Sequence, residues 1–88
     1  MDSFGGRLDG LDLINYGPVR TDRAAGLEVR ALGKGRWKFL LDRRAPGRAR
    51  VYGASEDYVL APGAGLVVDS TGRYDFAFGS VTREPVIR

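Results

Sequence analysis

The chain of 88 residues contains no cysteine and no histidine, and each absence removes a class of chemistry. Without cysteine it has no disulfide, no thiolate nucleophile and none of the sulfur ligands of most structural zinc sites. Without histidine it lacks the side chain that most often serves as a general base or transition-metal ligand near neutral pH. We therefore expect no catalytic residues, no metal site and no cofactor, and a protein that acts by binding or assembly.

Long apolar runs are also missing. No apolar run reaches the roughly 18 residues of a transmembrane helix, and no basic stretch followed by an apolar one marks a signal peptide. We expect cytoplasmic synthesis and no membrane span. Apolar residues make up 43% of the chain and charged residues 28%, which are ordinary values for a folded domain. A domain of this length buries only about 60 to 65% of its unfolded surface, so its core is thin.

From residue 27 onward, apolar and polar side chains alternate with the two-residue period of β-strands. Gly33-Lys34-Gly35 separates the first two strands and predicts a hairpin. The expected strands cover residues 27–32, 36–41, 48–52, 58–61, 66–68, 74–79 and 81–86. Turn residues between these short strands, with no amphipathic helix, predict an all-β fold. We expect a small antiparallel β-sandwich or barrel of about six or seven strands.

The alternation also predicts which side chains form the core. Trp37, Phe39 and Leu41 share one face of their strand. Tyr74, Phe76 and Phe78 share one face of another and give the clearest strand pattern in the chain. The complete expected core is Val29, Trp37, Phe39, Leu41, Val51, Val59, Leu66, Val68, Tyr74, Phe76 and Phe78.

Residues 1–16 predict an extended N-terminal arm, followed by a single β domain over residues 17–88. Asn15-Tyr16-Gly17-Pro18 has the composition of a turn and separates the two parts. The arm is rich in glycine and aspartate, yet it carries apolar side chains that need a surface to cover. They could pack on the same sandwich as an extra strand or bind a neighbouring subunit. The expected partner-binding residues of the arm are Phe4, Leu8, Leu11, Leu13, Ile14 and Tyr16.

Charge is distributed unevenly. Residues 30–50 hold eight basic side chains and one acid, a net of +7, so in a chain of +3 the remainder sums to −4. The eight are Arg30, Lys34, Arg36, Lys38, Arg43, Arg44, Arg48 and Arg50. Arg36 and Lys38 share one face of their strand, and Arg48 and Arg50 share one face of the next strand. If these two strands pair, the four side chains form a continuous basic patch.

Three interpretations of this basic segment stay open. It could bind nucleic acid or another polyanion through phosphate contacts. It could be a solvated strand face whose charges prevent a sheet from pairing with copies of itself. It could also complement the acidic arm of a neighbouring copy. Base stacking would need exposed aromatic rings beside the basic side chains. Of the three aromatic residues in this region, Trp37, Phe39 and Tyr52, the first two are expected in the core, which weakens the case for nucleic acid.

Asp69-Ser70-Thr71-Gly72 resembles the Asp-Ser/Thr-Gly signature of aspartic proteases, whose viral forms are short all-β dimers. The match fails, because an extra residue separates the aspartate from the glycine and Arg73 follows. A fixed cation would lower the carboxylate pKa instead of supporting a shared proton between two carboxylates. An Asx-type turn explains these residues.

Tyr58-Val59-Leu60-Ala61-Pro62-Gly63, followed by Tyr74-Asp75 and Phe78-Gly79, is similar to the small β-sandwich repeats at the C-terminus of bacterial phospholipase C. The similarity covers about residues 27–83. It implies a non-catalytic accessory domain of a lipid-acting or carbohydrate-acting system. Such a domain predicts exposed aromatic rings around Tyr52, Tyr58 and Tyr74.

In its general type, a small β domain with a terminal arm looks like the accessory and connector subunits of bacteriophage heads and tails, where arms cross between copies. We therefore expect a non-enzymatic structural subunit that docks into a larger protein complex through its arm and charged sheet face. The expected partners are protein subunits, as a homo-oligomer or a larger assembly, with incorporation into a virion. Polyanion binding and an accessory β-sandwich role are the alternatives.

Overall fold

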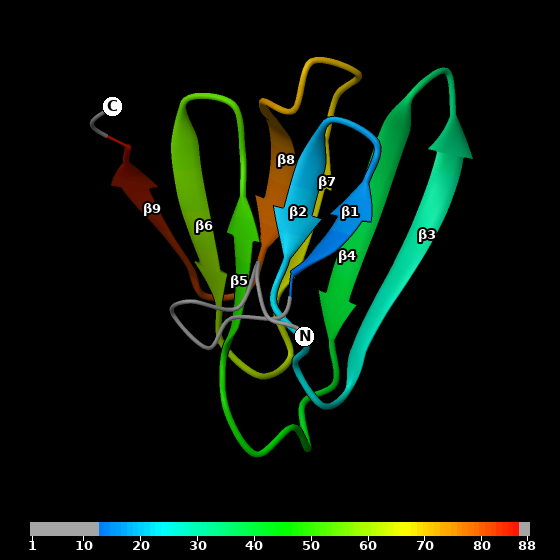
Figure 1. Cartoon of the computed structure of the whole chain (residues 1–88). Coiled ribbons are helices and arrows are strands. Elements are labelled where there is room, and N and C mark those ends of the chain that lie inside the picture. Colours follow the sequence, from blue (N-terminus) through cyan, green and yellow to red (C-terminus); the bar gives the residue numbers. More distant parts are fainter. Residues whose placement is uncertain (1–12, 87–88) are drawn as a thin grey trace, which may run out of the picture.

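The computed structural model describes residues 13–86, which form two antiparallel β-sheets packed as a sandwich (Figure 1). One sheet has five strands in the order β1-β2-β5-β6-β9, and the other has four in the order β3-β4-β7-β8. The strands are β1 (Ile14–Tyr16), β2 (Val19–Thr21), β3 (Leu27–Gly33), β4 (Arg36–Leu41), β5 (Ala49–Tyr52), β6 (Glu56–Leu60), β7 (Gly65–Val68), β8 (Tyr74–Phe78) and β9 (Val81–Pro85). The all-β prediction is confirmed, and the fold is a sandwich.

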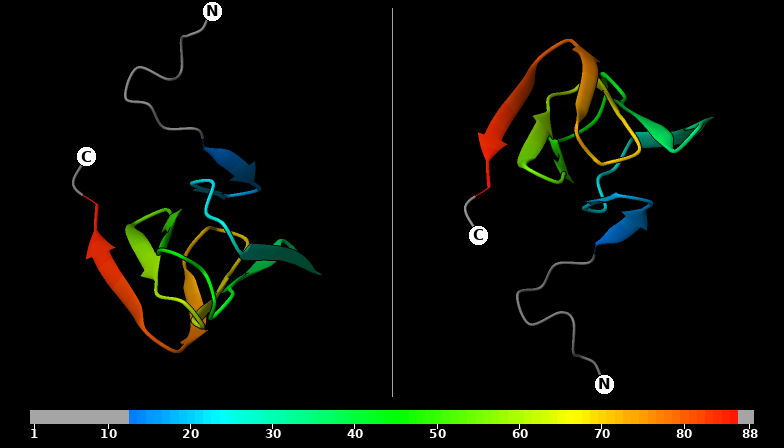
Figure 2. Two further views of the ribbon diagram at one scale, coloured as in Figure 1. Left: turned by 90° about the horizontal axis from the view of Figure 1, so that it is seen from below. Right: turned by 90° about the horizontal axis from the view of Figure 1, so that it is seen from above.

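Successive hairpins alternate between the two layers. The hairpins β1-β2 and β5-β6 belong to the five-stranded sheet, and β3-β4 and β7-β8 belong to the four-stranded sheet. β9 then returns to the five-stranded sheet beside β6. Figure 2, seen from below and from above, shows β1 and β9, the two edge strands of the five-stranded sheet, on opposite sides of the molecule. This topology places β4 and β5 in different sheets although they follow each other in the sequence.

The seven strands expected from residue 27 onward correspond to β3–β9, and β1 and β2 are additional. β1 and β2 pair through the tight turn at Gly17-Pro18, with Tyr16 opposite Val19. Ile14, Asn15 and Tyr16, at the end of the predicted arm, therefore belong to the five-stranded sheet. Leu13 precedes β1, and both Leu13 and Ile14 are half-buried. Phe4, Leu8 and Leu11 lie outside the described residues.

Tyr16 joins the two sheets at the β1 side of the sandwich. Its ring centroid lies 5.6 Å from that of Trp37 and 5.9 Å from that of Phe39, both on β4. Gly17 follows with φ of +61°, and a Cβ at this position would lie 2.8 Å from the Trp37 indole nitrogen. The turn therefore needs glycine both for its backbone conformation and for the close approach of the indole.

The core lies between the sheets, as the alternation predicts for most positions. Its fully buried aromatic side chains are Phe39 and Tyr58, surrounded by aliphatic residues of both layers. The buried core consists of Val19, Phe39, Leu41, Ala49, Val51, Tyr58, Leu60, Ala64, Leu66 and Val68. Among the expected core residues, Phe39, Leu41, Val51, Leu66 and Val68 are confirmed, and Val29 and Trp37 pack against them half-buried.

Val59 was expected in the core, and this prediction is wrong. β6 begins at Glu56, and its register places Tyr58 opposite the buried Val51. Because directly paired residues point to the same side of a sheet, Tyr58 enters the core. Val59 pairs with Arg50 and so lies on the outer side of the five-stranded sheet.

The expected burial of Tyr74, Phe76 and Phe78 is also wrong. Val67 pairs with Phe76 and Val68 pairs with Tyr74, so one extra residue, Asp75, lies in β8 without a direct partner. This β-bulge reverses the alternation and turns Phe76 and Phe78 to the outside of the four-stranded sheet. Tyr74, Phe76 and Phe78 are 37%, 53% and 39% exposed. Ala77 faces inward, beside Leu66.

Substitution of Phe39 and of Phe76 tests the assignment of Phe39 to the core and of Phe76 to the outer side of the four-stranded sheet. We expect Phe39→Ala to lower the free energy of unfolding by about 3 to 5 kcal/mol, because it removes a fully buried ring. We expect Phe76→Ala to cost about 1 kcal/mol or less, because its ring is largely in solvent. Urea unfolding at low protein concentration measures both, and equal costs would contradict the assignment.

Candidate docking surface on the four-stranded sheet

The outer side of the four-stranded sheet carries an apolar ridge of Leu40, Val67, Phe76 and Phe78. Val67 lies directly opposite Phe76, and Gly65 lies between Leu40 and Phe78 in the register. The rings of Phe76 and Phe78 have centroids 6.2 Å apart. Val67 is only 4% exposed, although it points away from the core. The ridge is therefore a packed cluster, unlike the single exposed apolar residues found on most surfaces.

Gly65 shows how closely the ridge lies on the sheet. The ring of Phe78 covers the Gly65 backbone so tightly that a Cβ at that position would overlap with ring carbons. An aromatic ring from a neighbouring strand can in this way shield a strand glycine that has no side chain of its own. Phe78 is thus held over β7 and presents the other side of its ring to solvent.

A cationic flank of Arg30, Arg36 and Lys38 lies beside the ridge on β3 and β4. Lys38 is opposite Val67 on one side and opposite Arg30 on the other. Arg30 contacts Glu28 at 2.7 Å, and Arg36 contacts Asp75 at 2.8 Å. No ion pair to Lys38 occurs within residues 13–86. Two cations opposite each other on neighbouring strands repel, and the Glu28 carboxylate beside Arg30 offsets part of this repulsion.

The continuous basic patch proposed from the sequence does not form, because β4 and β5 do not pair. Arg36 and Lys38 lie on the four-stranded sheet, and Arg50 lies on the outer side of the five-stranded sheet. Arg50 contacts Asp57 at 3.2 Å and Glu84 at 2.8 Å. The hydrogen bond from Arg50 to Glu84 is the main reason that its pKa is raised. Arg50 is thus already neutralised.

The other predicted basic residues lie at the ends of the sandwich. Lys34 is in the β3-β4 turn, where it adopts a positive φ of 56°. Arg43, Arg44 and Arg48 are exposed in the segment between β4 and β5. Within that segment, the Asp42 carboxylate accepts a hydrogen bond from the Arg44 backbone N–H at 2.9 Å.

A second cluster joins the sheets on the side opposite Tyr16. Tyr58 and Tyr74 have ring centroids 6.3 Å apart, and the Arg83 guanidinium lies 4.3 Å from the Tyr74 ring centroid. Glu56 accepts hydrogen bonds from Arg83 at 2.8 Å and from the Tyr58 hydroxyl at 3.2 Å. Burial raises the pKa of Tyr58, and the hydrogen bond from Arg83 lowers the pKa of Glu56. These contacts connect β8 to the five-stranded sheet.

The aromatic rings expected for an accessory domain do not gather on one exposed surface. Tyr58 is fully buried, and Tyr74 lies beneath Arg83. Tyr52 lies elsewhere, opposite Arg20 on the neighbouring strand β2.

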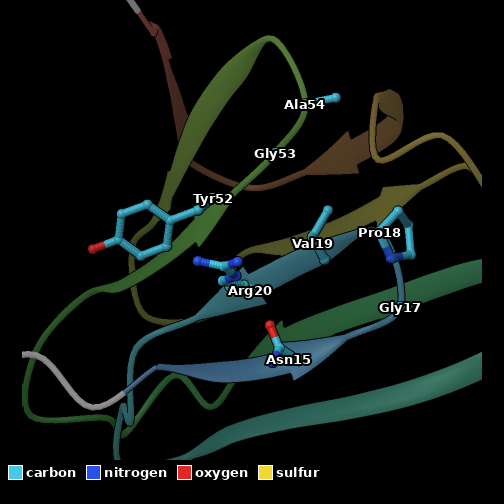
Figure 3. Close-up of a pocket in the computed structure, with 8 residues that line it drawn as sticks. All are labelled: Asn15, Gly17, Pro18, Val19, Arg20, Tyr52, Gly53 and Ala54. Carbon is cyan, nitrogen blue, oxygen red and sulfur yellow. The ribbon is translucent and has the colours of Figure 1, made fainter. Parts of the chain in front are cut away.

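A shallow hollow lies next to Tyr52 on the five-stranded sheet (Figure 3). It is lined by Asn15, Gly17, Pro18, Val19, Arg20, Tyr52, Gly53 and Ala54. Among the described lining residues, Arg20 is the one charged side chain. The same described residues include no paired carboxylates and no hydroxyl beside a base, the arrangements used in general acid–base and nucleophilic catalysis.

Asp69 uses its carboxylate to build the turn before β8. Its Oδ1 accepts hydrogen bonds from the Thr71 backbone N–H at 2.8 Å, the Thr71 hydroxyl at 2.6 Å and the Arg73 backbone N–H at 3.2 Å. The Thr71 hydroxyl is the main cause of the lowered pKa of Asp69. The geometry is that of an Asx-type turn.

Within residues 13–86 no group of three or more acidic side chains is arranged to hold a metal ion. The same part of the chain has no helix with the length and apolar character needed to cross a membrane. Comparison of the chain with protein-family models, curated proteins and solved structures finds no significant match. The similarity to phospholipase C repeats therefore stays an expectation.

The Glu56–Arg83 contact predicts a pH dependence of stability. Because the pKa of Glu56 is lowered in the folded protein, the unfolded chain takes up the proton first as the pH falls. The stabilisation should be complete above the unfolded glutamate pKa of about 4.3 and lost as the pH falls through the lower folded value. Urea unfolding between about pH 6 and pH 3 should show a shallower decline for Glu56→Gln and for Arg83→Gln than for the wild type. Identical slopes would show that this contact does not contribute.

Proposed function

We propose that this chain is a non-enzymatic assembly subunit that docks into a larger protein complex through its charged four-stranded sheet face and its N-terminal arm. The observation that carries the proposal is the exposure of Phe76 and Phe78, 53% and 39%, within a packed apolar ridge. Protein interfaces characteristically have aromatic anchors at their centre and arginine near them. The apolar ridge and the cationic flank have this composition.

The β-bulge at Asp75 adds support. Bulges commonly redirect side chains at functional edges of a sheet. Here the bulge places two phenylalanine rings in solvent, where each exposed ring is unfavourable in an isolated subunit. A protein partner that covered the apolar ridge would recover this hydrophobic free energy.

We propose a second copy of the chain as the partner. Residues 30–50 carry a net charge of +7 and the remainder −4, so the chain contains both signs of a complementary contact. Such complementarity favours association and fixes its orientation. We propose a bacteriophage head or tail as the setting, because a small β domain with a terminal arm is similar in general type to the accessory and connector subunits of these particles.

Polyanion binding is the second candidate, favoured by one observation. Arg43, Arg44 and Arg48 are exposed in one segment, and no ion pair to these three side chains occurs within the described part of the chain. They could contact phosphates without a fixed base sequence. No aromatic residue lies in that segment to stack on bases. Of the two aromatic residues that flank it in the sequence, Phe39 is buried in the core and Tyr52 is half-buried.

Light scattering tests the proposal directly. We expect the wild-type mass to rise above the monomer value of 9.6 kDa as the concentration increases from about 10 μM to 1 mM. Phe76→Ser should raise the dissociation constant about tenfold or more, because it removes a central aromatic anchor. Val59→Ser, on the outer side of the five-stranded sheet, is the matched control and should change the dissociation constant less than about twofold.

Two results would oppose the proposal. One is equal association of wild type and Phe76→Ser, with both variants folded as shown by cooperative unfolding. The other is tight, salt-dependent binding of single-stranded DNA that survives Phe76→Ser and is lost in Arg43→Glu/Arg44→Glu. That second result would favour the polyanion-binding function.

A further inference from the structure

We infer that residues 1–12 of one copy bind the apolar ridge and cationic flank of a second copy. This inference rests on the proposed function and names the two surfaces that meet. It assigns complementary roles to the N-terminal segment and to the outer side of the four-stranded sheet. Each copy would then donate one segment and accept another.

The composition of residues 1–12 matches the surface it would cover. Its apolar side chains, other than Met1, are Phe4, Leu8 and Leu11. Its three aspartates and one arginine give a net side-chain charge of −2. The apolar ridge offers apolar contact area, and the cationic flank carries three cations. Burial of apolar side chains would supply affinity, and opposite charges would orient the segment.

Lys38 is the point at which a carboxylate fits best. Arg30 and Arg36 already contact Glu28 and Asp75, whereas no ion pair to Lys38 occurs within residues 13–86. Lys38 also lies opposite Val67, so an apolar and a cationic position are direct neighbours on this face.

The N-terminal segment repeats the complementary pattern. Asp9 and Leu11 are two residues apart, so they share one side of an extended segment. This spacing could place the leucine against the apolar ridge and the aspartate near Lys38. One short segment would then supply both the apolar and the charged part of the contact.

A contact between two different surfaces is heterologous. Such contacts close into rings or continue as filaments, depending on the rotation between neighbours. They also allow a mixture of two defective copies to form one complete contact. A chain that covered its own ridge, or two ridges that faced each other, would not show this behaviour.

The decisive experiment mixes two full-length variants, each defective in one surface. The arm variant carries Leu8→Ser and Leu11→Ser and keeps the ridge. The ridge variant carries Phe76→Ser and keeps the arm. We expect each alone to remain a monomer of about 9.6 kDa by light scattering. Their equimolar mixture should give a species of twice that mass that does not grow further with concentration.

A charge exchange gives a second, independent readout. Lys38→Glu should weaken wild-type association about fivefold or more, because it opposes the aspartates of the segment. Adding Asp9→Lys and Asp12→Lys to the same chain should restore association to within about twofold of wild type. Lys34→Glu, at the hairpin turn away from the ridge, is the matched control for a lost cation and should leave association within about twofold of wild type. Adding the same pair of lysines to Lys34→Glu should weaken association, because these lysines would then oppose the unchanged Lys38.

The outcomes separate this inference from the proposed function. If the arm variant associates like the wild type while Phe76→Ser does not, the ridge is a docking surface but binds something other than residues 1–12. The inference then fails, and the proposed function stands. If the mixture stays monomeric or the charge exchange gives no rescue, the inference also fails. If Phe76→Ser associates like the wild type, both fail. A monomeric wild type whose arm variant exposes Phe76 further would show that the segment covers its own ridge.

Discussion

The register between β7 and β8 determines which side of the sandwich receives Phe76 and Phe78. Asp75 lies in β8 without a direct partner on β7, so the alternation reverses between Tyr74 and Phe76. The ion pair between Arg36 and Asp75, at 2.8 Å, holds this extra residue toward β4. Without the bulge, both rings would point between the sheets and the apolar ridge would not exist. The candidate surface therefore depends on one inserted residue.

The space between the sheets explains why these rings lie outside. Two packed sheets are separated by about 10 Å, and this layer is already filled by Phe39, Tyr58 and aliphatic residues of both sheets. Opposite Leu66, β8 contributes only the small side chain of Ala77. Tyr16 on one side and Tyr74 on the other complete the contact between layers. The core is thus complete without Phe76 and Phe78, which leaves them available to a partner.

Local patterns predicted local structure, and pairing between distant strands decided the rest. Alternation and Gly33-Lys34-Gly35 were sufficient for the β3-β4 hairpin and for the burial of Phe39 and Leu41. β1 and β2, with three residues each, are too short to show a period. Lys38 and Arg30 were recognised as cations outside the core, and the structure has Lys38 half-buried and Arg30 exposed, but Phe76 was assigned to the core. The position of a β-bulge, and the sheet to which a strand belongs, depend on how strands distant in the sequence pair with each other. The sequence of a single strand does not contain this information.

Fluorine NMR of a fluorophenylalanine at position 76 tests the central claim, which is that a second copy covers the apolar ridge. The account predicts that this resonance shifts with increasing protein concentration, over the same range in which the mass by light scattering rises. A fluorophenylalanine at position 39, fully buried in the core, should show no such shift. A resonance at position 76 that stays constant while the mass rises would contradict the account, because association would then use a different surface.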